Sequence, residues 1–261
     1  MIEDPMSELP TPGESIAELK RLLAMWHAHD GGAAIPLIDG TAVPGVAIHV
    51  QVEHIAELTE AVLELLHHNI YLSTAPLIRL SMECAVNAAW WAREPIGVRG
   101  SMHEAARQSS LLVRAVRRLS PGAFRNTKHL DAALRDFAQF ASDEARVFER
   151  RCRAIPGGDW IYPYYRILSQ GSHGGPSLLE EYMEPIAPTK DNPDGVSLVQ
   201  RPHYRHLELA LGTQVIMFAL AMAAWDSVLP SHPDEKELYE LSDRLGFGAL
   251  LRQATGRAAN S

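Results

Sequence analysis

The chain has little of what marks a metalloprotein, a secreted protein or a nucleotide-binding enzyme. Its 261 residues include only two cysteines, Cys84 and Cys152, and no Cys-x-x-Cys pair. Neither a zinc ribbon nor a disulfide framework is therefore indicated, and a reducing compartment is expected. There is also no glycine-rich phosphate loop, no Gly-x-Ser-x-Gly elbow and no His-Glu-x-x-His motif. We therefore expect no cofactor.

The chain also has few apolar runs that approach the length of a membrane span. The stretch that comes nearest, residues 209–225, is uncharged but includes Gly212, Thr213 and Gln214. A spanning helix needs about 20 predominantly apolar residues, so we interpret this stretch as a buried core helix. The start of the chain is acidic and contains proline, unlike a secretory signal. We expect a cytoplasmic protein with no membrane partner.

The negative charge of the chain is unevenly distributed. The formal net charge is −8, but residues 99–153 contain 12 Lys and Arg residues against 6 Asp and Glu residues. The rest of the chain therefore carries a formal charge of −14. A basic surface suits RNA or another anionic ligand. The alternative interpretation is that these arginines are the solvated faces of ordinary helices.

Composition and periodicity predict an all-α fold. Hydrophobic residues make up 46% of the chain and charged residues 21%, which is typical of a globular protein with a sizeable core. We predict one bundle of seven or eight helices over residues 14–255, with flexible tails at 1–13 and 256–261. The expected helices have apolar residues at helical spacing and cover 14–29, 50–70, 77–93, 102–119, 131–153, a short segment after Asp159, 204–228 and 234–245.

Two connections in this bundle are long. Residues 33–49 hold glycines and prolines among small apolar residues, and we expect a loop there with a short strand at 46–50. Residues 185–203 contain four prolines and an Asp-Asn-Pro-Asp-Gly turn sequence. A connection of this length is typical of a lid or of a disordered excursion.

The segment with the most chemical information runs from Tyr164 to Gly175. Arg166 precedes His173 by seven residues, about two helical turns, so a helix would place both on one face with Ser169 between them. An arginine beside a group that titrates near neutrality can bind a phosphate or another anion. This pair is a candidate site.

A second polar pattern occurs in the predicted helix at 77–93. Arg79, Glu83 and Asn87 follow one another at four-residue intervals on an otherwise apolar helix. One interpretation is an internal Arg79–Glu83 ion pair. The other is that the stripe faces Arg166 and His173, with Glu83 orienting the imidazole.

These two segments together carry a family resemblance. The phrase from Leu77 to Trp90 resembles the Arg-x-x-x-Glu-x-x-x-Asn helix of a group of uncharacterised bacterial proteins common in actinobacteria, and residues 165–174 resemble their Tyr-x-x-Leu-Ser-x-x-x-His-Gly segment. Those proteins are similar to the HEPN superfamily, helical domains in which an arginine precedes a histidine by a gap of four to six residues. Here the gap is six, and Ile167 stands where a polar residue commonly follows the arginine.

The resemblance implies a function for the named residues. Many HEPN domains are metal-independent ribonucleases that compose their site from two copies, and others are binding or dimerisation modules. By this resemblance Arg166, His173 and Glu83 are candidate catalytic residues in a homodimer. Candidate binding residues are Arg79, Asn87, Ser169 and Tyr165. The alternatives are a non-catalytic protein-binding module, or a small-molecule enzyme or binder with a pocket beneath residues 185–203.

A metal site is not expected. Glu64 and His67 have the Glu-x-x-His spacing of carboxylate-bridged two-metal bundles, which need two such pairs on facing helices. The chain contains no second Glu-x-x-His.

Overall fold

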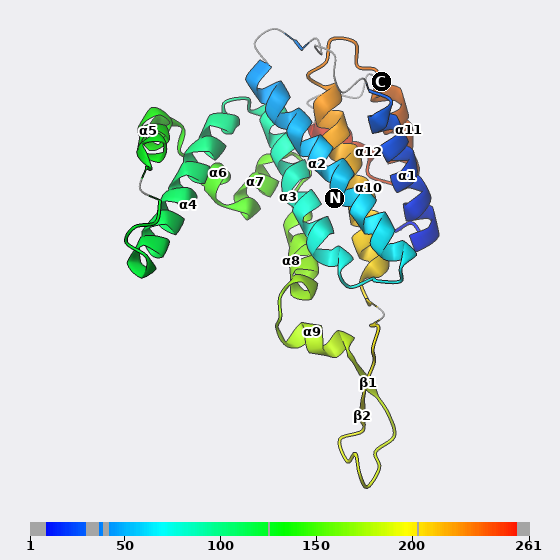
Figure 1. Ribbon diagram of the computed structural model, residues 1–261. Coiled ribbons are helices and arrows are strands. Elements are labelled where there is room, and N and C mark those ends of the chain that lie inside the picture. The colour runs from blue at the N-terminus through cyan, green and yellow to red at the C-terminus, as the bar shows by residue number, and fades with distance from the viewer. Residues whose placement is uncertain (1–8, 30–36, 39–41, 125, 203, 255–261) are drawn as a thin grey trace.

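Four long helices form the centre of the computed structural model (Figure 1). They are α1 (Pro12–His27), α2 (Ala42–His67), α3 (Thr74–Arg93) and α10 (Leu207–Asp226). The structure describes residues 9–29, 37–38, 42–124, 126–202 and 204–254. Of the expected tails at 1–13 and 256–261, residues 1–8 and 256–261 lie outside the described residues. The bound of the N-terminal tail at residue 13 is too late, because α1 begins at Pro12.

The innermost helix is α10, which contacts α1, α2 and α3. Every residue from Ala210 to Asp226 is buried, which follows from a sequence that is apolar on all sides. By length and composition α10 could cross a membrane, but 83% of its most apolar window is buried inside the fold. The predicted core helix at 209–225 is therefore found in the centre of the bundle.

The first helix shows how local sequence sets an element's start. The Thr11 hydroxyl accepts a hydrogen bond from the Glu14 backbone N–H at 3.3 Å, and the Glu14 carboxylate accepts one from the Thr11 N–H at 2.8 Å. This reciprocal capping satisfies two donors that the first turn of a helix leaves free, and Pro12 occupies the first helical position.

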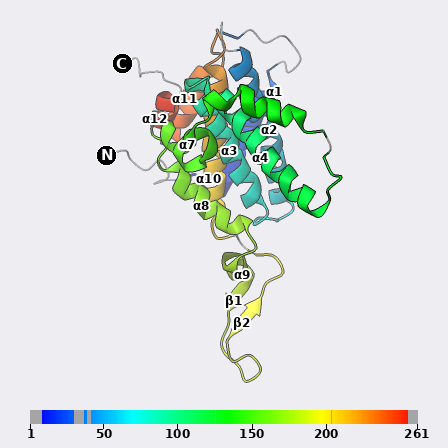
Figure 2. The same ribbon diagram turned by 90° about the vertical axis from the view of Figure 1, so that its left-hand side faces the viewer.

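A side structure, which we call the arm, stands out from the bundle (Figures 1 and 2). It comprises α4 (Gly97–Leu119), α5 (Lys128–Asp136), the 3-10 helix η1 (Ala138–Phe140) and α6 (Asp143–Arg146). Gly100 permits the packing of η1 on α4, because a Cβ at this position would lie 2.8 Å from the carbonyl oxygen of Phe140. The first turns of α4 contact α2 and α3, and its remaining partners are within the arm.

The single helix expected at residues 131–153 is wrong. The chain there forms α5, η1, α6 and then α7 (Phe148–Ala154). Ser142 has an extended backbone, and its hydroxyl accepts a hydrogen bond from the Ala145 N–H at 3.2 Å, which starts a new helix. Of the apolar residues at helical spacing in this segment, only Ala145 is buried, and the others are Leu134, Phe137, Phe140, Ala141 and Phe148.

After α7 the chain packs against the bundle through one helix and then projects away from it. Helix α8 (Ile161–Ser172) packs on α3, and α9 (Pro176–Glu181) leads into a hairpin. Its strands β1 (Met183–Pro185) and β2 (Val196–Leu198) pair antiparallel. The hairpin points away from the bundle rather than over it, so the described part of 185–203 is not a lid (Figure 2).

The all-α character is confirmed, but the details differ from the prediction. The described residues form twelve α-helices, one 3-10 helix and a two-stranded sheet, rather than seven or eight helices. Several of the additional helices, such as α9 and α12 (Gly248–Ala254), are too short to show a clear period. The last long helix is α11 (Glu235–Arg244). The strand expected at 46–50 lies within α2, so that prediction is wrong.

Candidate functional site

The predicted stripe on α3 is a polar joint between α3 and α8. The hydroxyl of Tyr165 accepts a hydrogen bond from Arg79 Nη2 at 2.5 Å and donates one to Glu83 Oε1 at 2.8 Å. Arg79 Nη2 also lies 3.2 Å from Glu83 Oε1, and its guanidinium lies 4.8 Å from the centre of the Tyr165 ring. The Arg79–Glu83 pair therefore forms as its four-residue spacing predicts, and Tyr165 bridges it.

This joint has little spare capacity for a ligand. Partial burial raises the pKa of Tyr165 above its usual value, opposed by the hydrogen bond from Arg79, so the phenol remains a neutral bridge at neutral pH. Arg79 Nε is buried and has no hydrogen-bond partner among the described residues. The three side chains chiefly hold α8 in register on α3.

Asn87 extends the joint toward α7. Its Oδ1 accepts a hydrogen bond from Arg151 Nη1, and its Nδ2 donates one to Gln51 Oε1 at 3.4 Å. Arg151 also donates to the carbonyl oxygens of Glu144 (2.9 Å) and Ala145 (2.5 Å), and burial lowers its pKa. Arg151 therefore clamps α6 and α7 onto α3, a role that sequence reasoning missed.

Arg166 and His173 lie outside this joint. Helix α8 turns Tyr165 and Leu168 toward the bundle, and Arg166, one residue after Tyr165, is exposed. His173 directly follows the last helical residue and is also exposed. Within the described part of the chain, neither side chain forms a hydrogen bond or an ion pair. Their seven-residue spacing separates the two Cα atoms by about 10 Å along the axis.

The expected contact between Glu83 and His173 is therefore not formed. Glu83 Oε1 bonds to Tyr165 and Arg79 instead. The reason is geometric: successive helical residues point about 100° apart, so the residue that faces α3 is Tyr165 and not its neighbour. Ser169 lies between Arg166 and His173 as expected, but its hydroxyl donates to the Tyr165 carbonyl oxygen at 2.7 Å.

The aromatic residues of this segment mainly pack within the fold. The Tyr162 and Tyr165 rings are stacked with centroids 6.1 Å apart, and Trp160 meets Tyr164 edge-on at 5.5 Å. All four are partly buried against the core. Tyr162 precedes Arg166 by one helical turn, so its ring is the one placed on the same side as Arg166 and His173.

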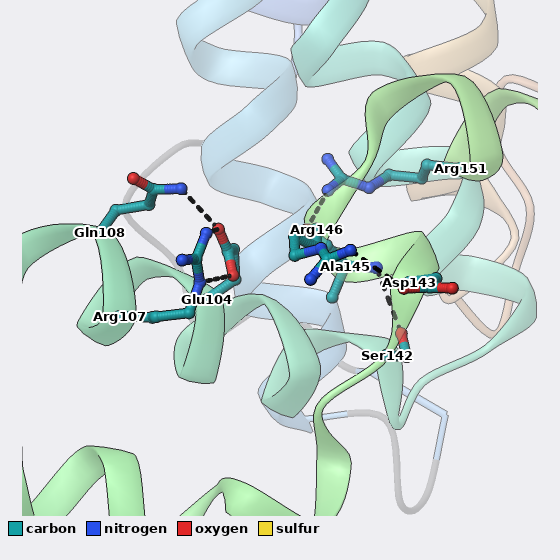
Figure 3. A network of polar contacts seen from close by, with 8 residues as sticks. All are labelled: Glu104, Arg107, Gln108, Ser142, Asp143, Ala145, Arg146 and Arg151. Carbon is teal, nitrogen blue, oxygen red and sulfur yellow. Dashed lines mark hydrogen bonds and ion pairs between the residues drawn. The ribbon is translucent and has the colours of Figure 1, made fainter. Parts of the chain in front are cut away.

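Many of the arginines in the basic segment 99–153 have partners. In Figure 3, Arg107 forms a two-pronged interaction with Glu104, with Nε at 2.6 Å and Nη2 at 2.7 Å. Asp143 pairs with Arg146 and Arg150, and Glu149 pairs with Arg153. Within residues 99–153, the described basic residues that are exposed and form no ion pair are Arg99, Arg114, Arg118, Lys128 and Arg135. The unpaired positive charge of this segment thus lies on the arm.

The sequence does not predict a cluster of aromatic and titratable side chains around His49. The His49 ring lies between Trp26 (5.2 Å) and Trp225 (4.9 Å), and burial lowers its pKa. His29 Nε2 lies 2.7 Å from Asp234 Oδ2, and this hydrogen bond raises the pKa of His29. These five residues come from four separate segments, so no local motif indicates the cluster. The nearest signal in the sequence is the charged residue Asp226, which ends the apolar helix α10.

The described residues contain no cluster of side chains that could bind a metal ion. No group of three or more His, Cys, Asp or Glu side chains there is placed to hold an ion. Cys84 and Cys152 are buried, and burial raises the pKa of each thiol to about 12, which keeps both protonated. Glu64 bonds to His68 at 3.0 Å rather than acting with His67.

A cavity of about 630 Å³ lies where α3 ends and the arm begins. Its lining includes Trp90, Arg93 and Phe140, but neither Arg166 nor His173. A small-molecule pocket beneath residues 185–203 therefore has no support from this cavity.

Comparison of the chain with protein-family models, with curated proteins and with solved structures finds no match.

Proposed function

We propose that this chain binds single-stranded RNA along the exposed edge of α8 and cleaves it without a metal, through Arg166 and His173. The observation that carries the proposal is that both side chains are exposed and free of internal partners, while the neighbouring Tyr165 fixes α8 on α3. A cation and an imidazole that no internal contact uses are available to a phosphate.

The chemistry follows from these two groups. His173 accepts the proton of an RNA 2′-hydroxyl as this oxygen forms a bond to the adjacent phosphorus and the bond from phosphorus to the 5′-oxygen breaks. Arg166 stabilises the charge that builds on the non-bridging oxygens. The departing 5′-oxygen needs a proton at the same time, and one imidazole cannot both take and give it. A homodimer supplies the second imidazole, in line with the HEPN resemblance.

The binding surface has a side chain suited to an unpaired base. Tyr162 lies one turn before Arg166 on the same side of α8 and is partly exposed. Stacking of a base on an aromatic ring is tolerant of sequence and needs single-stranded RNA. Ser169 and Tyr165 support this edge from within, and Glu83, Arg79 and Asn87 hold α8 and α7 in place.

The test is cleavage of a panel of labelled single-stranded RNAs by the full chain in EDTA. We expect His173→Ala to lower the rate by at least about 100-fold, the usual scale of general acid–base catalysis. His67→Ala, an exposed histidine on α2, is the matched control and should leave the rate unchanged. Wild-type protein that neither cleaves nor binds any RNA in the panel contradicts the proposal.

A non-catalytic module is the second candidate, because the hydrogen bonds of the α3 stripe are all internal. This candidate, a dimerisation or protein-binding module, predicts that the wild type cleaves no RNA and that Arg166→Ala and His173→Ala leave any RNA binding unchanged. If Arg166→Ala weakens RNA binding but the wild type cleaves no RNA, the proposed RNA recognition stands and only the proposed cleavage is ruled out.

A further inference from the structure

The end of the arm exposes large apolar side chains. We call residues 111–128, from the last turns of α4 to the start of α5, the arm tip. Leu112 is 61% exposed, Leu119 88% and Phe124 53%. Leu112 and Leu119 are seven residues apart and so lie on one side of α4. Ordinary solvation does not account for three such side chains at one projecting end.

The turn of the arm tip holds one of these side chains in an unusual conformation. Phe124 has a φ of 51°, a region that bulky residues rarely adopt. Arg117 donates hydrogen bonds to the carbonyl oxygens of Ala123 and Phe124, which fixes the turn. Backbone strain that side chains maintain in this way is common where a segment contacts a ligand or partner.

The arm tip is also the most basic part of the molecule. Residues 105–130 contain six Lys and Arg residues and no Asp or Glu. Arg114, Arg118 and Lys128 are exposed and have no ion-pair partner in the described chain. Arg118 suits the negative end of the α4 dipole, but that interaction does not explain the exposed leucines.

We propose that the arm tip binds an anionic lipid surface. Exposed leucine and phenylalanine side chains in the same short segment as exposed basic groups are a combination that inserts into the interface of a bilayer while the cations bind lipid phosphates. The remainder of the chain is acidic, with a formal charge of −14 outside residues 99–153, so an anionic bilayer repels it and admits only the arm tip. Such peripheral binding requires no spanning helix, but it departs from the expectation from sequence that the chain has no membrane partner.

Charge and exposure also argue against two other partners for the arm tip, a second copy of the chain and RNA. A second arm tip would bring two basic surfaces together with no acidic group from residues 105–130 of either copy. Single-stranded RNA would pair with the cations but would leave Leu112 and Leu119 exposed to water. Only a surface that is anionic and has an apolar interior uses all of these side chains. The proposal does not depend on Arg166 or His173.

The experiment is co-sedimentation of the full chain with vesicles of phosphatidylcholine alone and of phosphatidylcholine with phosphatidylglycerol. We expect binding only to the anionic vesicles, weakened at least about tenfold between about 50 mM and about 500 mM salt. The variants L112S/L119S and R114A/R118A should each lower the binding constant at least about tenfold. Leu198→Ser, equally exposed but on the hairpin, is the control and should bind as the wild type does. All the changed side chains are exposed, so the variants should keep the helical content and melting temperature of the wild type.

Several results would overturn the proposal. One is no binding to anionic vesicles, and another is equal binding to neutral vesicles. A third is binding that neither pair of substitutions weakens. Light scattering that shows a dimer lost in L112S/L119S, with vesicle binding unchanged, would assign the surface to a second copy. RNA binding that R114A/R118A abolishes, with no vesicle binding by the wild type, would assign it to nucleic acid.

Discussion

The central bundle and the arm both carry large apolar side chains, but they bury them to very different extents. In α10 each large apolar side chain from Leu211 to Trp225 is buried, whereas Leu112 and Leu119 of α4 are mostly exposed. One cause is the size of the neighbouring elements: α10 packs against the long helices α1, α2 and α3, while α4 packs mainly against the short elements α5, η1 and α6 of the arm. A large apolar side chain on a helix therefore does not by itself show how much it stabilises the fold. We expect the bundle to set global stability and the arm to open locally.

The largest expected difference comes from truncating one large apolar side chain in each region. Phe218 on α10 is fully buried, so Phe218→Ala should lower the free energy of unfolding by about 3–5 kcal/mol through lost burial and an internal cavity. Leu119→Ala on the arm should change it by less than about 0.5 kcal/mol, because this side chain is already in water. Urea denaturation followed by circular dichroism measures both. Equal losses for the two variants would show that the arm is part of the cooperative core.

A buried hydrogen bond tests the bundle at a polar position. Thr59 Oγ1 accepts from Gln214 Nε2 at 2.7 Å and donates to the Ile55 carbonyl oxygen at 2.7 Å. Thr59→Val should cost about 1–3 kcal/mol, because it leaves the buried amide of Gln214 without an acceptor. In the double variant with Gln214→Leu, part of this loss should return, since neither partner is then unsatisfied. A double variant whose loss is the sum of the two single losses would be evidence against this pairing.

The ion pair between His29, just after α1, and Asp234, just before α11, predicts a pH dependence. Asp234 raises the pKa of His29 above its usual value of about 6.5, so the pair stabilises the fold fully below about pH 6.5. This stabilisation is lost as the pH rises through the folded-state pKa of His29. Asp234→Asn should therefore cost about 1 kcal/mol more at about pH 5.5 than at about pH 8.5.

The lowered pKa of His49 acts in the opposite direction, since burial favours its neutral form and folding stability falls as this ring is protonated. His49 is present in both the wild type and Asp234→Asn, so the difference between their pH dependences of folding stability reports on His29. Thermal melts at the two pH values give the comparison. A cost that is the same at both would contradict the assignment.

The smallest expected effect tests the turn of the arm. Arg117→Ala removes the hydrogen bonds that fix Ala123 and Phe124 and should change global stability by about 0.5 kcal/mol or less, as exposed positions commonly do. Native-state hydrogen exchange should nevertheless become faster for residues 120–130 and stay unchanged for α10. Faster exchange in α10 would mean that the two regions unfold together.

The extent to which sequence predicts this fold also differs between the two regions. The helices at 77–93 and 209–225 are long and continuous, so their apolar patterns locate α3 and α10 to within a few residues. In residues 128–154 a cap at Ser142 and a 3-10 turn interrupt what the pattern presents as one helix. Such breaks depend on local hydrogen bonds that compete with an otherwise adequate helical period.

The candidate site shows the same limit. The Arg79–Glu83 pair is visible because both residues lie on one helix. The bridge by Tyr165 is not, since it joins positions 82 residues apart and depends on which side of α8 meets α3. The roles of Arg151 and of the five-residue cluster that includes His49 could not be predicted for the same reason. Their roles depend on contacts between distant segments, which spacing within one element does not report.

The position of α10 has a consequence for synthesis on the ribosome. The three helices that pack around it are complete by residue 93, but α10 begins only at residue 207. At about 5–20 residues per second, roughly ten seconds separate the two events. During that interval the nascent chain presents uncovered apolar faces of α1, α2 and α3, while the arm between them has already emerged. The N-terminal half of this protein should therefore be a client of ribosome-associated chaperones until its last long core helix arrives.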